Sequence, residues 1–220
     1  MNYIFNGLVR LKPGTASPDF IEPDLAESWT ETDEGRTLTF RLRDGVRFHD
    51  GKPLTSADVK FTLLEVSSKY GSKFNAPGKA IKQIDTPDPQ TVIVRLAKPF
   101  GPFLFSLSCE QNAGILPKHI FENTDILKNP ASLTKPVGAG PYTLVDWSNP
   151  GPDETVVLER NDNYWDEGKP YLDIPSGDAV DSLMGILQDE RGRPTRRHGQ
   201  NWEDMILLGM AAYLLEHPAY

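Results

Sequence analysis

Short stretches of the chain alternate apolar and polar residues with the period of two that is typical of a strand with one buried face. Every second residue is apolar in 37–43 and again in 91–96. The dipeptide Asp44-Gly45 favours a tight turn and predicts a hairpin between 37–43 and 46–48. A second hairpin is expected between 81–85 and 91–96, across a turn rich in proline and aspartate.

A helical spacing replaces this alternation after Thr55. The run Thr55-Ser56-Ala57-Asp58 is typical of a helix start, because a threonine hydroxyl can cap the first turn and a carboxylate is favourable there. The apolar positions that follow predict a helix that ends near Gly71. These positions are Val59, Phe61, Leu63, Leu64 and Val66.

The rest of the chain up to about residue 174 predicts further short elements. A short helix is expected within 100–107, a buried strand ending at 115–117, and a helix over 118–121 with Pro117 at its first position. Strands are expected at 142–147 and 155–160, joined by a loop of turn residues. Strands and helices together predict a mixed α/β fold with a hairpin-rich sheet and flanking helices.

The pattern changes near Pro175. Residues 190–200 hold four arginines, two glycines and a proline with no apolar residue. We therefore expect one domain over 1–174 and a helical tail over 175–220, with helices at 179–187 and 202–215.

Composition limits the function classes. The chain has 220 residues, of which 38% are hydrophobic and 25% are charged, as in ordinary soluble globular proteins. Its 31 acidic residues against 23 Lys and Arg give a net charge of −8, which argues against nucleic acid as the main partner. The first residues do not have the pattern of a signal peptide, and no apolar window is long enough for a membrane span.

The sequence offers little catalytic chemistry. The one cysteine, Cys109, allows no intrachain disulfide. The residue directly before it is neither a histidine nor a carboxylate, the groups that could activate its thiolate. His49-Asp50 has no nucleophile with it, and the four histidines are not at metal-ligand spacing. We expect no enzyme activity, no metal and no cofactor.

Two groups of residues are candidates for ligand contact. Tyr70 and Phe74, with glycine and serine between them, are expected to be exposed in the loop after the helix, where they either wall a ligand cleft or pack across the surface. The second group is a polar patch between two apolar segments, which either supplies amides and a carboxylate to a ligand or is a surface loop. Its residues are Cys109, Glu110, Gln111, Asn112 and Ala113.

Seven segments, read in order, resemble one family and span about residues 3–173. They are Phe5–Val9, Pro23–Trp29, Leu38–Val59, Ile115–Phe121, Pro136–Tyr142, Leu158–Trp165 and Gly168–Asp173. Together they resemble the extracytoplasmic solute-binding proteins, family 5, that serve ABC importers for peptides, opines and nickel.

The resemblance implies one lobe of a periplasmic-binding-protein type II fold, which closes on a ligand held between two lobes. It implies an oligopeptide or similar small solute as ligand, an ABC permease as partner and a periplasmic or extracytoplasmic location. Phe74 and the segment 109–113 match cleft-lining regions of the family. The second lobe is expected to be missing here, and the residues do not decide between peptide, nickel chelate and sugar.

Another class of function remains open. The apolar residues within 202–215 could form a surface for a partner or for self-association, which would make the chain an interaction module. A hydrolase is not supported, because the sequence contains no nucleophile–base pair.

Overall fold

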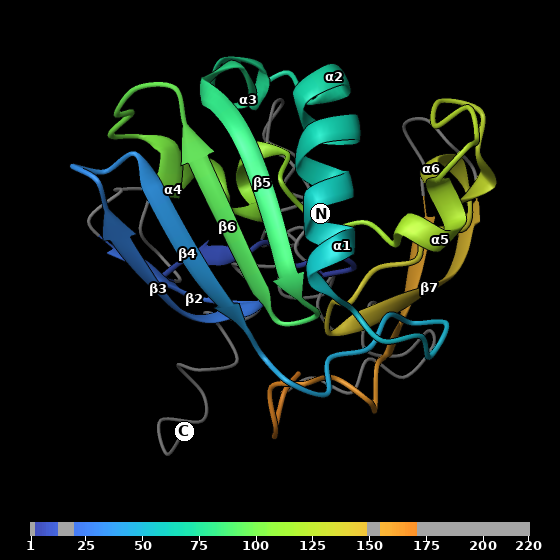
Figure 1. Ribbon diagram of the computed structural model, residues 1–220. Helices are drawn as coiled ribbons and strands as arrows, with labels where there is room; N and C mark the ends of the chain where they lie inside the picture. Colours follow the sequence, from blue (N-terminus) through green and yellow to red (C-terminus); the bar gives the residue numbers. More distant parts are fainter. Residues whose placement is uncertain (1–2, 13–19, 149–154, 171–220) are drawn as a thin grey trace, which may run out of the picture. The chain divides into compact units, whose positions relative to one another are not determined.

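The structure is a computed structural model that describes residues 3–12, 20–148 and 155–170 (Figure 1). The chain divides into two units, Met1–Leu172 and Asp173–Tyr220, and all of the described residues belong to the first. The helices expected at 179–187 and 202–215 lie outside the described residues.

The main sheet has four antiparallel strands in the order β3-β4-β6-β5. They are β3 (Ala26–Thr32), β4 (Thr37–Leu42), β5 (Ile81–Asp88) and β6 (Thr91–Leu96). The register places Phe40 opposite Val92 and Leu38 opposite Val94. These four side chains are at most 2% exposed, so the alternation in both strands marks the buried face of the sheet, as predicted.

One helical segment runs along β5 and β6 (Figure 1). It consists of α1 (Ser56–Phe61), a π-helix η2 (Thr62–Ser67) and α2 (Ser68–Tyr70). The predicted start is confirmed, because the Asp58 carboxylate accepts hydrogen bonds from the Thr55 amide (2.9 Å) and the Thr55 hydroxyl (2.8 Å). Its other oxygen accepts from the Lys118 amide (2.9 Å), which joins this helix to α5 (Lys118–Phe121).

Buried positions along this helix differ in part from the predicted stripe. Val59 and Leu63 are fully buried, whereas Phe61, Leu64 and Val66 are only half-buried. Thr62 is also buried. Its hydroxyl donates a hydrogen bond to the Leu116 carbonyl (3.3 Å) and accepts one from the Leu116 amide (2.9 Å). A polar residue can be buried there because its hydrogen bonds are satisfied.

Short elements complete the unit. β1 (Val9–Leu11) pairs with β2 (Ile21–Pro23), and β7 (Tyr142–Ser148) pairs with β8 (Thr155–Arg160), both antiparallel. The β7–β8 pair was predicted. The remaining helices are α3 (Asn75–Ala80), α4 (Phe103–Ser106), the 3₁₀ helix η3 (Cys109–Gln111), α5 and α6 (Pro130–Leu133).

Three local predictions are wrong. Residues 46–48 do not pair with 37–43, because β3 and β6 occupy both edges of β4, and 46–48 folds onto 52–54 instead (Leu54 N to Val46 O, 2.9 Å). The second hairpin turns later than expected, since β5 continues to Asp88. Residues 115–117 form no strand, and Pro117 is the N-cap of α5 rather than its first residue.

Candidate ligand-binding surface

The segment 107–115 runs beside the N-terminal strand. The Leu8 amide donates to the Leu107 carbonyl (3.2 Å), the Ile115 amide donates to the Asn6 carbonyl (2.8 Å), and Ser108 forms an isolated bridge with Val9. A Cβ atom at Gly7 would lie 2.7 Å from the Leu107 carbonyl oxygen and 2.7 Å from the Cys109 nitrogen. Only glycine allows the two segments to approach this closely.

The two predicted groups of candidate residues come together in the structure. Asn112 has a left-handed backbone (φ 64°), and its Oδ1 accepts hydrogen bonds from the Lys73 amide (3.3 Å) and the Ser72 hydroxyl (3.4 Å). A Cβ atom at Gly71 would lie 3.3 Å from the Asn112 Cβ. Tyr70, which was expected in the loop after the helix, is the last residue of α2. We call residues 70–74, which are this helix end and the turn after it, the helix-end loop, and residues 109–114 the polar loop.

The candidate residues differ in exposure. Tyr70 is 50% exposed, and Gln111 and Asn112 are half-buried, so these three side chains are at least partly accessible to solvent. Cys109 and Ala113 are buried, and the side chain of Glu110 lies outside the described part of the structure.

The expectation that Phe74 is exposed is wrong. Its side chain is fully buried and belongs to the hydrophobic core. The cause is the tight turn at Gly71, where the Phe74 amide donates to the Gly71 carbonyl (3.1 Å) and returns the chain to the core. A Cβ at Gly71 would lie only 2.6 Å from the Ser67 carbonyl oxygen, so this turn needs glycine.

Residues at the start of the chain border the polar loop. A Cβ atom at Gly114 would lie 3.1 Å from both the Phe5 Cβ and the Cys109 Sγ. Phe5 is half-buried and lies beside Gly114 of the polar loop. The sequence pattern alone did not identify this position, because one apolar residue before the first strand carries no periodic signal; Phe5 entered only as part of a family motif.

His49 fixes the loop that leads into β7. Its Nδ1 accepts from the Gly138 amide (3.3 Å), its Nε2 lies 3.0 Å from the Gly140 carbonyl oxygen, and its own amide donates to the Gly138 carbonyl (2.8 Å). Burial lowers the pKa of His49, and the nearby Asp50 carboxylate opposes this only in part. Both ring nitrogens are occupied by main-chain groups, so His49 has a structural role here.

A buried polar network supports the N-terminal strand. The Asp24 carboxylate accepts from the Asn6 amide group (2.8 Å) and from the Gly7 main-chain amide (3.1 Å). The Asn6 amide group also lies 3.2 Å from the Tyr164 hydroxyl, and burial raises the pKa of that hydroxyl. These side chains come from three of the family-like segments, and their hydrogen bonds join those segments to one another.

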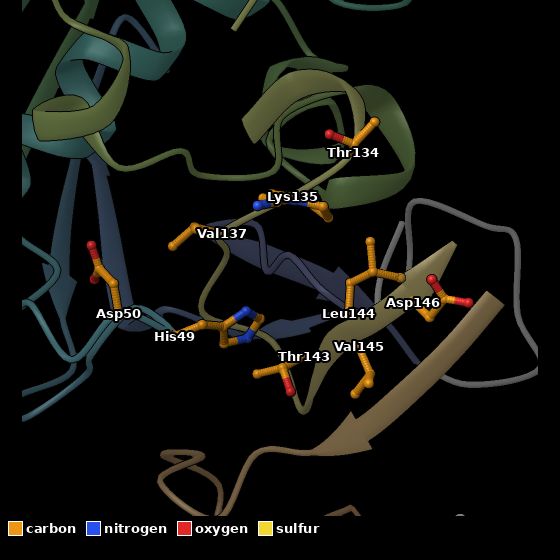
Figure 2. A pocket seen from close by; sticks show the side chains of 10 residues that line it. His49, Asp50, Thr134, Lys135, Val137, Thr143, Leu144, Val145 and Asp146 are labelled. Atoms are coloured by element: carbon orange, nitrogen blue, oxygen red, sulfur yellow. The ribbon is translucent and has the colours of Figure 1, made fainter. Parts of the chain in front are cut away.

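An open hollow of about 590 Å³ lies beside the His49 loop (Figure 2). Lys135 and Asp146 stand on different walls of it, and Val137 and Leu144 add apolar surface. None of the residues predicted to contact a ligand lines this hollow. The predicted ligand contacts at the helix-end and polar loops and this hollow are therefore separate surfaces.

Neither metal ligation nor membrane insertion is indicated in the described part of the chain. No group of three or more His, Cys, Asp or Glu side chains there could hold a metal ion. No helix in those ranges combines the length and the apolar character needed to cross a bilayer.

Comparison with known families decides which class of protein this is. The sequence model for bacterial extracellular solute-binding proteins, family 5 Middle, matches residues 21–174. The chain belongs to this family. The match confirms the resemblance predicted from the seven segments, and the location that the family description gives is extracellular.

Individual family 5 proteins show the same similarity. The oligopeptide-binding protein AppA of Bacillus subtilis is 34% identical over 177 residues, which cover 78% of this chain and 32% of AppA. The glutathione-binding protein GsiB of Escherichia coli K12 is 33% identical over 159 residues, covering 68% of this chain and 28% of GsiB.

Solved structures of family 5 proteins show the same fold. NikZ from Campylobacter jejuni in complex with Ni(L-His) superposes with a TM-score of 0.65 at 32% identity, covering 74% of this chain and 31% of NikZ. AppA in complex with a nonapeptide gives a TM-score of 0.65 at 28% identity. The predicted fold, part of a periplasmic-binding protein, is thereby confirmed, and the chain spans about a third of the length of these relatives.

Proposed function

We propose that this chain is the ligand-holding part of a solute receptor that delivers peptides or related small solutes to an ABC importer. The observation that carries the proposal is family 5 membership over residues 21–174, together with relatives whose names state binding of oligopeptides or glutathione. The chain spans about a third of the length of those relatives. The transport function therefore belongs to a whole receptor, in which a second lobe would supply the opposite wall of the cleft.

The helix-end and polar loops suit recognition of a small solute. Tyr70 offers an exposed ring and Asn112 an amide, and both stand on loops fixed by short backbone contacts. A receptor of this kind closes when its ligand binds, because the closed state makes more contacts with that ligand. One lobe alone makes only half of these contacts, so we expect weak binding by the isolated chain.

The ligand would be held without chemical change. The relatives are named as binding proteins, Cys109 is buried, and both ring nitrogens of His49 lie within hydrogen-bond distance of main-chain groups. The partner would be a membrane permease, and the location extracytoplasmic. The alternative, an interaction module formed by residues 175–220, depends on residues outside the described ranges.

An NMR titration tests the proposal. The ¹⁵N-labelled chain is titrated with tetraalanine, which offers mainly main-chain groups. Shift changes are expected in residues 70–74 and 109–114, and the peptide should remain intact in the recovered sample. Shift changes confined to the hollow at Lys135, no shift at any concentration, or cleavage of the peptide would each contradict the proposal.

A matched pair of variants sharpens the test. Tyr70→Ala should weaken tetraalanine binding, because Tyr70 is 50% exposed on the helix-end loop. Phe20→Ala removes an aromatic ring of similar exposure (47%) outside both loops, and should leave binding unchanged. Equal effects of the two substitutions would argue against this surface.

A further inference from the structure

The Asn112 side-chain amide is fixed in one orientation where the two loops meet. Its Oδ1 accepts from the Lys73 main-chain amide and from the Ser72 hydroxyl. A main-chain amide can only donate, so the oxygen of the Asn112 side chain, and not its nitrogen, must face Lys73. The side-chain Nδ2 therefore lies away from the Lys73 amide.

The Nδ2 group remains available for a ligand. The side chain of Asn112 is half-buried, and its hydrogen-bond partners Ser72 and Lys73 both donate to Oδ1. The hydrogen bonds to Oδ1 already fix the side chain, so its Nδ2 donor loses little rotational freedom when a ligand binds. Such a donor recognises an acceptor oxygen.

The support beneath the helix-end loop is rigid. The Ser68 hydroxyl donates to the Leu63 carbonyl (2.5 Å) at the end of the π-helix, and the Gly71 amide donates to the Ser67 carbonyl (2.9 Å). α3 packs directly on Ser68, because a Cβ atom at Gly78 would lie 2.9 Å from the Ser68 Cβ. Lys73 is therefore presented to Asn112 by elements whose positions are set by close packing.

We propose that Asn112 determines specificity at this surface through its two ends. Its Oδ1 locks the helix-end loop to the polar loop, and its Nδ2 donates a hydrogen bond to a carbonyl oxygen of the ligand, the acceptor that a peptide main chain repeats at every residue. The donor role rests on the proposed function, whereas the lock is a property of the chain itself.

Two substitutions separate the lock from the donor. Asn112→Asp keeps an acceptor oxygen for Lys73 and tolerates the left-handed backbone, but it has no donor. Asn112→Gly also tolerates this backbone and removes both ends of the side chain. Asn123 is an exposed asparagine with nearly the same φ (62°) outside both loops, so Asn123→Asp and Asn123→Gly are the matched controls.

The lock is measured through Cys109, the single cysteine of the chain, which is 4% exposed. A neutral reagent, 4,4′-dithiodipyridine, reports how often this thiol becomes accessible. Asn112→Gly should raise the reaction rate several-fold, because the polar loop loses its hold on the helix-end loop, and Asn112→Asp should react no faster than the wild type. An unchanged rate in Asn112→Gly would refute the lock.

The donor is measured by titration with tetraalanine. Asn112→Asp should bind about tenfold more weakly, since a hydrogen bond is replaced by a carboxylate facing a carbonyl oxygen. Wild-type affinity in Asn112→Asp would refute the donor role. If the wild-type chain binds no tetraalanine, the proposed function and the donor role both fail, and the Cys109 rates still decide the lock.

Discussion

Gly138 lies where the loop before β7 crosses the N-terminal residues, and no side chain fits there. A Cβ atom at this position would lie 1.8 Å from the Ile4 carbonyl oxygen and 2.9 Å from the Phe5 Cδ1. Gly138 is not among the residues with a positive φ, so alanine suits its backbone. Substitution of Gly138 by alanine therefore tests the close approach alone.

The cost of Gly138→Ala follows from what must move. Separating the two segments strains the packing, at about 1–3 kcal/mol. It also breaks the bond from the Gly140 amide to the Ile4 carbonyl and the bond from the Gly138 amide to the His49 Nδ1, each worth about 1 kcal/mol. We expect the free energy of unfolding to fall by about 3–5 kcal/mol, measured as a lower urea midpoint with an unchanged slope.

Gly101→Ala is the control for this substitution. A Cβ atom at Gly101 meets nothing within 4 Å, so its urea midpoint should stay close to that of the wild type. If Gly138→Ala were as stable as Gly101→Ala, the close contact between Gly138 and Ile4 would be wrong. The assignment of the loop to a position against the N-terminal strand would then have to be revised.

Two further predictions concern polar groups. Burial lowers the pKa of His49, so the folded chain binds fewer protons than the unfolded chain just below the ordinary pKa of 6.5. The contribution of His49 to the free energy of unfolding should therefore be complete above about pH 6.5 and fall as the pH drops below it. Urea midpoints at pH 7.5, 6.5 and 5.5 measure this, and His49→Gln should reduce the dependence of the midpoint on pH in that range. Asp58→Ala removes the acceptor of Thr55 and Lys118 at two helix starts and should cost about 2–4 kcal/mol, against about 1 kcal/mol for Thr55→Ala. Equal urea midpoints for these two variants would show that Asp58 acts only as a cap.

Local patterns predicted the elements whose stabilising groups are close in sequence. The helix start at Thr55 depends on a carboxylate three residues away, and the apolar faces of β4 and β6 follow directly from alternation. The partners of β4 could not be predicted in this way. One edge is filled by β3, the preceding strand, and the other by β6, whose residues are distant in sequence, and Asp44-Gly45 gave a turn signal that did not decide the pairing.

The candidate surface was predicted only in part. The sequence identified both loops, but their contact depends on the left-handed backbone of Asn112 and on its bond to Lys73, 39 residues away. Phe74 was predicted to be exposed because glycine and serine beside it are typical of a surface loop, whereas its side chain is buried. The tight approach at Gly71, which turns Phe74 inward, has no periodic signal.

The π-helix η2 lets the helical segment hold one additional residue without changing the direction of Tyr70. A π-turn holds about one residue more than the α-helical spacing needs, and each residue of an α-helix turns the chain by about 100°. Loss of a single codon within Thr62–Ser67 would remove the extra residue and restore the regular spacing, and Tyr70 would stay on the same side of the helix. This segment can therefore change in length by one residue while the helix-end loop keeps its place beside the polar loop.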